Sequence, residues 1–194
     1  MIFAYGSLVN QAARPGNLEA APAVLPGWSR EWMHRIVTPQ GRVCALTVAR
    51  DASSSIKGVV LESDDAEAFQ VDEREVGYER IPVVVRLIDG LSESSVSCSM
   101  YVGDQASRGP ATREYPIWRT YLDCVLLGYI ALGGPDAADE FVRSTRNWPA
   151  PILDDRESPK YPRAVSLTVD EKEVIDAILR RHLLLCDVFS SYNP

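Results

Sequence analysis

The first half of the chain carries the period-two apolar pattern of β-strands. A short apolar run, Ile2–Tyr5, opens the sequence, and β-branched residues are concentrated in Ile56–Leu61. The segment Ala23–Arg35 contains Pro26-Gly27 and is predicted to form a bent or bulged pair of strands. Further strands are predicted at Val43–Ala49, at Tyr78–Ile88 and at Val96–Val102, the last two joined by a turn at Asp89-Gly90.

The second half of the chain changes to helical spacing. Pro116 is predicted in the first turn of a helix, where proline is tolerated, and Gly133-Gly134-Pro135 ends that helix. Asp136–Arg146 forms the next predicted helix, and Thr168-x-x-Glu171 is a capping box that opens a last helix running to about Leu185. This order of elements indicates one α+β domain over residues 1–194, with strands mainly in the first half and helices mainly in the second.

Composition narrows the classes of function. The chain has 194 residues, 46% of them hydrophobic, and a net charge of −7, which argues against a nucleic-acid partner or an anionic membrane surface. No apolar run is long enough to span a bilayer, and no basic, apolar leader is visible. The simplest expectation is a cytoplasmic protein with reduced thiols. A dedicated zinc site is not expected, because the four cysteines are scattered without metal-ligand spacing: Cys44, Cys98, Cys124 and Cys186.

One carboxylate lies where a helix disfavours it. A helix is predicted at Asp64–Glu75, and Glu75 falls in its last turn, where the helix dipole opposes negative charge. Ala68, Val71 and Glu75 lie at positions i, i+3 and i+7, so the glutamate continues the apolar stripe of the helix. A carboxylate in these surroundings should have a raised pKa, which suits a general acid or base near neutral pH. The alternative is an exposed Glu75 that pairs with Arg74 or Arg80.

Two motifs taken together resemble a known family. Tyr5-Gly6-Ser7-Leu8 follows the first strand, and Asp72-Glu73-Arg74-Glu75-Val76-Gly77-Tyr78 lies some seventy residues later. This pair is similar to the gamma-glutamylcyclotransferase superfamily, which includes ChaC-like enzymes that degrade glutathione. A looser match, from Pro116 to Leu122, resembles the family segment that brings a tyrosine to the active site, here Tyr121.

The resemblance implies a small mixed β-barrel flanked by helices, with a cavity at one end and residues 136–194 as a helical C-terminal extension. It implies that Glu75 is the catalytic acid/base, and that Tyr5, Gly6, Ser7, Leu8 and Tyr121 bind the substrate. The family reaction cyclises a γ-glutamyl amino acid, peptide or amine to 5-oxoproline and releases the amine, with no metal or cofactor. A small-molecule γ-glutamyl substrate is therefore the expected partner.

Some alternatives stay open at this stage. A non-catalytic protein that binds a small metabolite is the second hypothesis, and covalent catalysis by Ser7 is a weaker one, because no histidine is suitably placed. The leaving group is open, since only Val76 separates Glu75 from Gly77, unlike the ChaC-like pattern. Oligomeric state is open as well.

Several polar residues of the second half also have competing interpretations. Asp123 is expected to be an ordinary surface charge of its helix. Asp154, Asp155 and Arg156 form either an ion pair within the Pro-rich loop or part of a lid over the pocket. His182 is expected to be a partly buried structural residue.

Overall fold

The computed structural model describes residues 1–16, 18–88, 94–182, 184–185 and 187–190. Its α-helices are α1 (Asp65–Arg74), α2 (Arg119–Ser144) and α3 (Val169–Arg181), and two short 3-10 turns are η1 (Ser7–Val9) and η2 (Gln11–Ala13). Its strands are β1 (Ile2–Ala4), β2 (Ala20–Thr38), β3 (Gly41–Leu61), β4 (Tyr78–Leu87), β5 (Ser95–Gly103), β6 (Ile117–Trp118), β7 (Thr145–Arg146), β8 (Ile152–Asp154) and β9 (Val188–Ser190).

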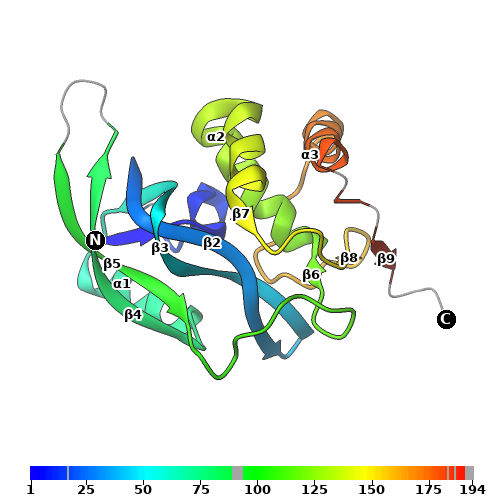
Figure 1. The fold of residues 1–194 in the computed structure, drawn as a ribbon, viewed down its shortest axis with the longest axis horizontal. Helices are drawn as coiled ribbons and strands as arrows, with labels where there is room; N and C mark the ends of the chain where they lie inside the picture. Colours follow the sequence, from blue (N-terminus) through cyan, green and yellow to red (C-terminus); the bar gives the residue numbers. More distant parts are fainter. Residues whose placement is uncertain (17, 89–93, 183, 186, 191–194) are drawn as a thin grey trace.

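Five strands close into a small mixed barrel, which confirms the expected fold class. Their order is β3-β1-β5-β4-β2, and a direct pairing of β2 with β3 closes the ring. The β1–β5 pairing is parallel and the other barrel pairings are antiparallel. β7 adds to the outer edge of β2, and β6, β8 and β9 form a separate parallel sheet. Figure 1 shows the barrel on the left, with α2, α3 and the small sheet on the right.

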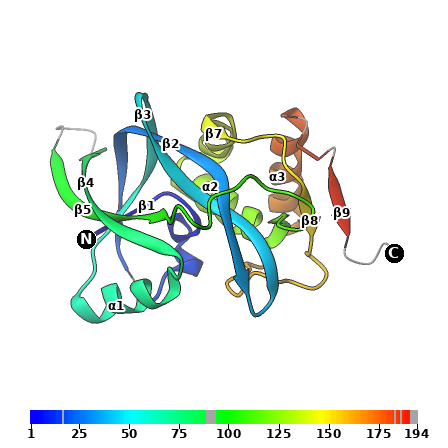
Figure 2. The ribbon, with the colours of Figure 1, turned by 60° about the horizontal axis from the view of Figure 1, so that its bottom comes forward.

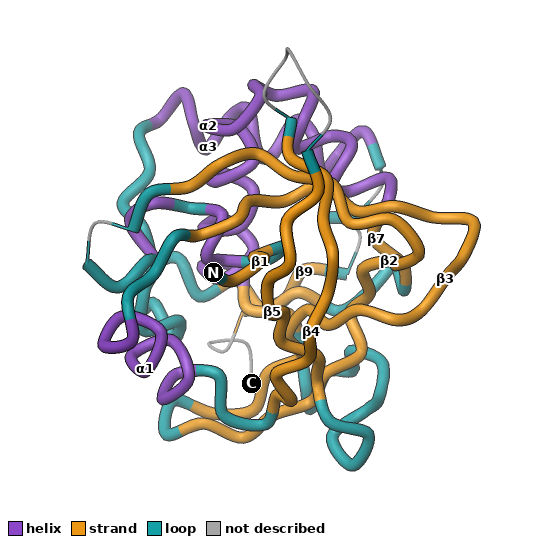
Figure 3. Tube along the Cα trace, turned by 90° about the vertical axis from the view of Figure 1, so that its left-hand side faces the viewer, coloured by secondary structure: helices purple, strands orange, loops and turns teal. Residues whose placement is uncertain are grey.

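The helices occupy different ends of the molecule. α1 lies beside the barrel at the lower left of Figure 2, far from α3. Viewed from the barrel side, β4 and β5 cross the front, while α2 and α3 lie at the top and α1 at the lower left (Figure 3). Within the described residues, no helix is long and apolar enough to cross a membrane.

Two long strands replace the shorter ones that the sequence predicts. Ala23–Arg35 is not a pair of strands but part of the single strand β2, and Val43–Ala49 and Ile56–Leu61 belong to the single strand β3. β2 absorbs its irregular residues through register shifts at Pro26/Trp28 and Trp32/His34. Gly27 has a positive φ of 80° at the first shift, a conformation that glycine adopts without a Cβ penalty.

The boundaries of the second half differ from the prediction in a few places. Pro116 lies before strand β6 rather than in a helix, and α2 begins at Arg119. Gly133 and Gly134 do interrupt α2 with non-helical backbone, as predicted, and the remainder of that helix ends at Ser144. The capping box at Thr168 is present, but α3 ends at Arg181, short of Leu185. The predicted turn at Asp89-Gly90 and Cys186 lie outside the described residues.

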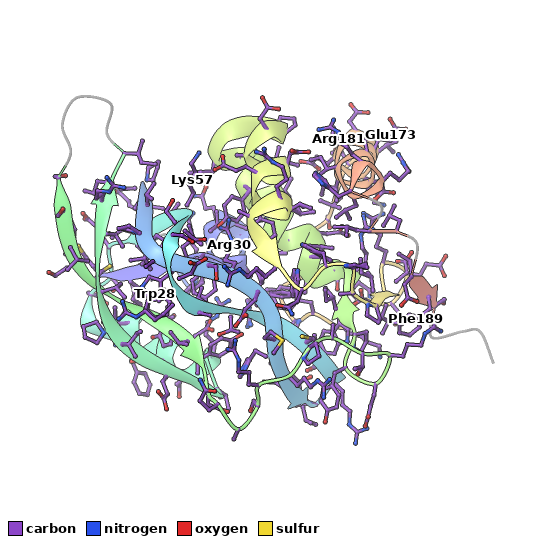
Figure 4. All side chains as sticks on the ribbon, in the orientation of Figure 1. Trp28, Arg30, Lys57, Glu173, Arg181 and Phe189 are labelled. Carbon is purple, nitrogen blue, oxygen red and sulfur yellow. The ribbon has the colours of Figure 1, made fainter. Side chains whose placement is uncertain are left out.

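A buried arginine joins the barrel to the long helix. Arg30 of β2 is 2% exposed, and its guanidinium donates to the Tyr129 hydroxyl at 2.6 Å and to Ser144 Oγ at 2.8 Å, both on α2. Figure 4 shows Arg30 between the β2 ribbon and α2. The Tyr129 hydroxyl in turn donates to the carbonyl of Tyr5 at 2.9 Å. This network fixes the end of β1, where the chain enters the turn described next.

Candidate active site

The six site residues named from the sequence surround one hollow. It has a volume of about 50 Å³ and lies where β1 ends, between the turn η1 and the end of α1. The residues that line it include Tyr5, Gly6, Ser7, Leu8, Glu75 and Tyr121. The turn and the helix end therefore line the same space.

Glu75 ends helix α1 with its side chain turned inward. It is the C-cap residue, its side chain is only 18% exposed, and its Oε1 lies 3.1 Å from Nε of Arg74. The exposed alternative is thus wrong, although the pairing with Arg74 is present; Arg80 pairs with Asp72 instead. Burial raises the pKa of the Glu75 carboxyl above its ordinary value, and the charges of Arg74 and Arg163 partly oppose this rise.

The turn opposite Glu75 is held by its own hydrogen bonds and by α2. The N–H of Val9 donates to the carbonyl of Gly6, and the N–H of Asn10 donates to that of Ser7, both at 3.0 Å. The N–H groups of Ser7 and Leu8 begin this turn and have no acceptor within it, as at any helix start. The Asn10 amide donates to the carbonyl of Cys124 at 2.9 Å, which anchors the turn on α2.

Gly6 keeps the hollow open. A Cβ at this position would lie 3.5 Å from the Tyr121 hydroxyl oxygen and 3.7 Å from Cδ1 of Leu46. Such an atom would make ordinary van der Waals contacts, so glycine is not required for packing here. It would, however, take up part of a hollow whose volume is only about 50 Å³.

Tyrosines form the remaining polar wall. The Tyr5 hydroxyl donates to the carbonyl of Tyr101 at 2.7 Å, and the Tyr78 hydroxyl donates to that of Leu46 at 2.8 Å. The Tyr121 ring meets the Tyr161 ring edge-on at a centroid distance of 5.1 Å. Burial raises the pKa of Tyr5, Tyr78 and Tyr121 above the ordinary range, so their hydroxyls stay neutral at physiological pH. Tyr78, which was not among the site residues expected from the sequence, also lines the hollow.

Arg74 connects the two walls of the hollow. Its guanidinium donates to the carbonyl of Ala13 at 2.6 Å and to Ser7 Oγ at 3.4 Å, while Nε faces Glu75. The helix end and the turn are thereby held at a fixed separation. The sequence indicated Arg74 only as a possible partner of Glu75, since nothing local reveals that its other acceptors lie near the N-terminus.

A second, larger cavity adjoins the hollow. Its volume is about 630 Å³, and it shares Ser7, Glu75, Tyr78 and Tyr121 with the hollow. Its other walls come from the end of β2 and the start of β3, from residues 74–78, and from the loop residues 161–163. A molecule whose reactive end fills the hollow can thus extend past Glu75 into a space of ligand-binding size.

The predicted surface charge Asp123 is buried, and so that expectation is wrong. Its carboxylate is 3% exposed and accepts from Arg119 at 2.9 Å and from Arg156 at 2.7 Å. Both arginines also bond to Asp176 of α3. Arg156 is therefore a member of an ion-pair network that ties the Pro-rich loop to α2 and α3.

Asp155 fastens the same loop to the start of α2. Its carboxylate is buried and accepts from the N–H of Thr120 at 2.8 Å, from Thr120 Oγ1 at 2.6 Å and from the N–H of Lys160 at 2.8 Å. The N-cap residue Trp118 supplies no side-chain cap, so Asp155 fills that role from a distant loop. The residue after Thr120 is Tyr121, which lines the hollow.

The histidines do not support catalysis by Ser7. His34 is fully buried and lies within 3.4 Å of a Cβ placed on Gly77, and neither of its ring nitrogens has a hydrogen-bond partner. His182 is partly buried, and Nε2 lies 3.0 Å from Oδ1 of Asp139, in agreement with the structural role expected for it. Neither histidine lines the hollow or the cavity beside it. In the part of the chain that the structure describes, no cluster of side chains has the composition of a metal site.

Comparison with known proteins agrees with this geometry. The sequence model of the family described as "Gamma-glutamyl cyclotransferase, AIG2-like" matches residues 2–120. A solved structure described as a gamma-glutamyl cyclotransferase is similar over 91% of this chain and 97% of its own, with a TM-score of 0.60 and 16% identity. The crystal structure of an uncharacterized protein from Homo sapiens is similar over 90% of this chain and 96% of its own, with the same score and identity. No curated protein matches the sequence significantly.

Proposed function

The chain belongs to the gamma-glutamyl cyclotransferase, AIG2-like family, and from this premise we propose that it converts a γ-glutamyl compound to 5-oxoproline and a free amine, with Glu75 as the acid/base. The observation that carries the proposal is the position of Glu75: a buried carboxylate with a raised pKa that faces the Tyr5–Leu8 turn across a small hollow.

The reaction places two demands on the hollow. The α-nitrogen of the glutamyl group must reach its own γ-carbonyl carbon, so the substrate has to bind in a folded pose that closes a five-membered ring. Because nucleophile and electrophile belong to one molecule, positioning supplies much of the rate enhancement. A hollow of about 50 Å³ beside the larger cavity would favour this compact pose over an extended one.

The protons have to be moved as well. The α-ammonium group loses two protons to become the N–H of the lactam, and the leaving nitrogen gains two to depart as an ammonium ion. The carboxylate of Glu75 accepts each proton from the α-nitrogen and delivers it to the leaving nitrogen, and it ends the cycle unprotonated. A raised pKa suits this double role, since the group then accepts and releases a proton at comparable cost near neutral pH. No water is consumed.

Charge develops on the γ-carbonyl oxygen when the α-nitrogen attacks. In this proposal, the N–H groups of Ser7 and Leu8 at the start of η1 donate to this oxygen or to the glutamyl carboxylate, and so does the Tyr121 hydroxyl; all three residues line the hollow. Arg74 holds the turn and Glu75 in a fixed relation. These donors are therefore positioned before the substrate binds.

The test is to incubate the protein with γ-glutamyl dipeptides, γ-glutamyl amines and glutathione, and to separate 5-oxoproline from free glutamate by mass spectrometry. We expect 5-oxoproline from at least one compound and an equal amount of the released amine. Free glutamate in place of 5-oxoproline would indicate hydrolysis and contradict the cyclisation. Binding of these compounds without any product would instead support the non-catalytic alternative.

A further inference from the structure

The larger cavity is lined by more positive than negative side chains, although the protein as a whole is acidic. The protein as a whole has a net charge of −7, yet Arg35, Arg74 and Arg163 line this cavity. Glu75 is the one carboxylate among the lining residues that the structure describes, and Arg74 already pairs with it. An excess of guanidinium groups in such a cavity favours an anionic ligand.

Two of these arginines, Arg35 and Arg163, have no salt-bridge partner in the described part of the chain, and Arg163 is the one whose charge acts on Glu75. Arg74 is paired with Glu75, and Nε of Arg35 donates to the carbonyl of Pro110 at 2.7 Å. Arg163 is half-buried, and its guanidinium lies over the Tyr161 ring, 5.2 Å from the centroid. Its Nε donates to the Tyr161 hydroxyl at 3.3 Å, and in the described part of the chain no carboxylate forms a salt bridge with it.

The position of Arg163 determines which part of a substrate it can meet. Arg163 lines the larger cavity but not the hollow, whereas Glu75 lines both. The charge of Arg163 nevertheless reaches Glu75, since it opposes the rise of the Glu75 pKa. When a γ-glutamyl group occupies the hollow, the atoms attached to its leaving nitrogen extend past Glu75 toward this guanidinium.

The loop that carries Arg163 is held firmly in place. Asp155 binds the start of α2 and the N–H of Lys160, and the N–H of Tyr161 donates to Thr120 Oγ1 at 3.4 Å. The Tyr161 ring, on which the guanidinium lies, packs against Tyr121. A guanidinium fixed in this way loses little conformational entropy when it pairs with an anion. This loop lies outside residues 2–120, the part of the chain that the family model matches.

We propose that Arg163 determines substrate specificity by pairing with a carboxylate on the leaving group, so that the preferred substrates are γ-glutamyl amino acids or peptides rather than γ-glutamyl amines. The carboxylate next to the leaving nitrogen of such a substrate is planar and accepts two parallel hydrogen bonds from a guanidinium. Apolar and aromatic residues of the same cavity, among them Ile36, Val37 and Trp118, surround the rest of the leaving group. This inference rests on the proposed function.

The experiment uses two substrates that differ only in the carboxylate. γ-Glutamylalanine and γ-glutamylethylamine are compared on the wild type, on Arg163→Leu and on Arg163→Lys, with 5-oxoproline as the readout. Lys160→Leu is the matched control, because it removes one positive charge from the same loop without changing a lining residue of the cavity. We expect Arg163→Leu to lower kcat/KM for γ-glutamylalanine by about 10- to 100-fold and to change that for γ-glutamylethylamine by less than about twofold.

Arg163→Lys is expected to recover part of the loss, and Lys160→Leu to show none. An equal loss on both substrates would overturn the proposal, because Arg163 would then contact the glutamyl group or support the fold. No loss on either substrate would overturn it too.

If the wild type forms 5-oxoproline from neither compound, the proposed function fails in that assay, and calorimetric binding of the same two compounds decides the inference. Weaker binding of γ-glutamylalanine alone to Arg163→Leu would support the role of Arg163 in recognising the carboxylate. Equal binding by the variant and the wild type, or no binding of either compound by the wild type, would overturn it.

Discussion

Asp155→Ala should destabilise the protein more than any comparable change in its loop. The substitution removes a buried carboxylate that accepts three hydrogen bonds, two from Thr120 and one from the N–H of Lys160. The backbone N–H of Thr120 belongs to the first turn of α2, and Trp118, the N-cap residue, offers no side-chain replacement. The alanine would leave these donors in a buried place without an acceptor.

The size of the effect follows from the bonds that are lost. Loss of a capping carboxylate costs about 1 kcal/mol, and each further hydrogen bond contributes about 1 kcal/mol. We therefore expect a decrease of about 3 kcal/mol in the free energy of unfolding. For a chain of this length, each kcal/mol lowers Tm by roughly 2–4 °C, so Tm should fall by about 6–12 °C.

Urea and thermal unfolding, followed by circular dichroism, measure this difference. The control is Asp154→Ala, because Asp154 is exposed and accepts a single hydrogen bond, from the N–H of Arg156 at 3.2 Å. Asp155→Asn should have an intermediate stability, since an amide oxygen can still accept from Thr120 while its NH₂ group cannot accept from Lys160. If Asp155→Ala has the same Tm as Asp154→Ala, the proposed attachment of the loop to α2 is wrong.

Three further predictions concern the hollow and the barrel behind it. Gly6→Ala should keep its Tm within about 2 °C of the wild type, because the added Cβ makes only ordinary contacts. Its kcat/KM for 5-oxoproline formation should nevertheless fall about tenfold or more, since the methyl group occupies the space of the glutamyl group. Unchanged kinetics would contradict this position for the substrate. Burial raises the pKa of Glu75, and the carboxylate is the active form in the proposed reaction. The value of kcat/KM should therefore fall as pH decreases through a pKa above the ordinary 4.5. A flat profile between pH 4.5 and 8 would refute the role of Glu75. Burial lowers the pKa of His34 below its ordinary 6.5, so as pH decreases His34 binds a proton in the unfolded chain before it does in the folded protein. The free energy of unfolding, measured with urea, should therefore fall as pH decreases below 6.5, by up to about 1.4 kcal/mol per pH unit. His34→Gln should lose this component, and an identical pH slope in the variant would contradict the prediction.

The features that could be predicted from the sequence depend on residues that lie close together in the chain. The capping box at Thr168 marks the start of α3, because a side chain and a backbone N–H three residues apart complete the motif. Glu75 could also be recognised from its local sequence, because both the apolar stripe of its helix and the helix dipole disfavour an acidic residue at that position. Such a conflict often indicates a functional position.

Other features depend on partners that are distant in the sequence. Asp123 looks like a surface charge of its helix because its partner Arg156 lies 33 residues away in an irregular loop. Arg74 reaches the carbonyl of Ala13 across 61 residues, and no local pattern predicts that contact. The continuity of β3 was missed because residues 51–54 show no hydrophobic alternation, whereas β2 pairs with β3 on both sides of them, at Arg50 and at Ser55.

The most direct test of the central claim compares Glu75→Gln with Glu73→Gln. Both changes remove one carboxylate near the end of α1, but only Glu75 lines the hollow, and the glutamine keeps its shape and a hydrogen-bond acceptor for Arg74. 5-Oxoproline formation is measured together with calorimetric binding of the substrate that the wild type turns over best. We predict that Glu75→Gln binds this substrate but forms 5-oxoproline at least about a thousandfold more slowly than the wild type, while Glu73→Gln retains full activity. Turnover by Glu75→Gln at a rate close to that of Glu73→Gln would contradict the account.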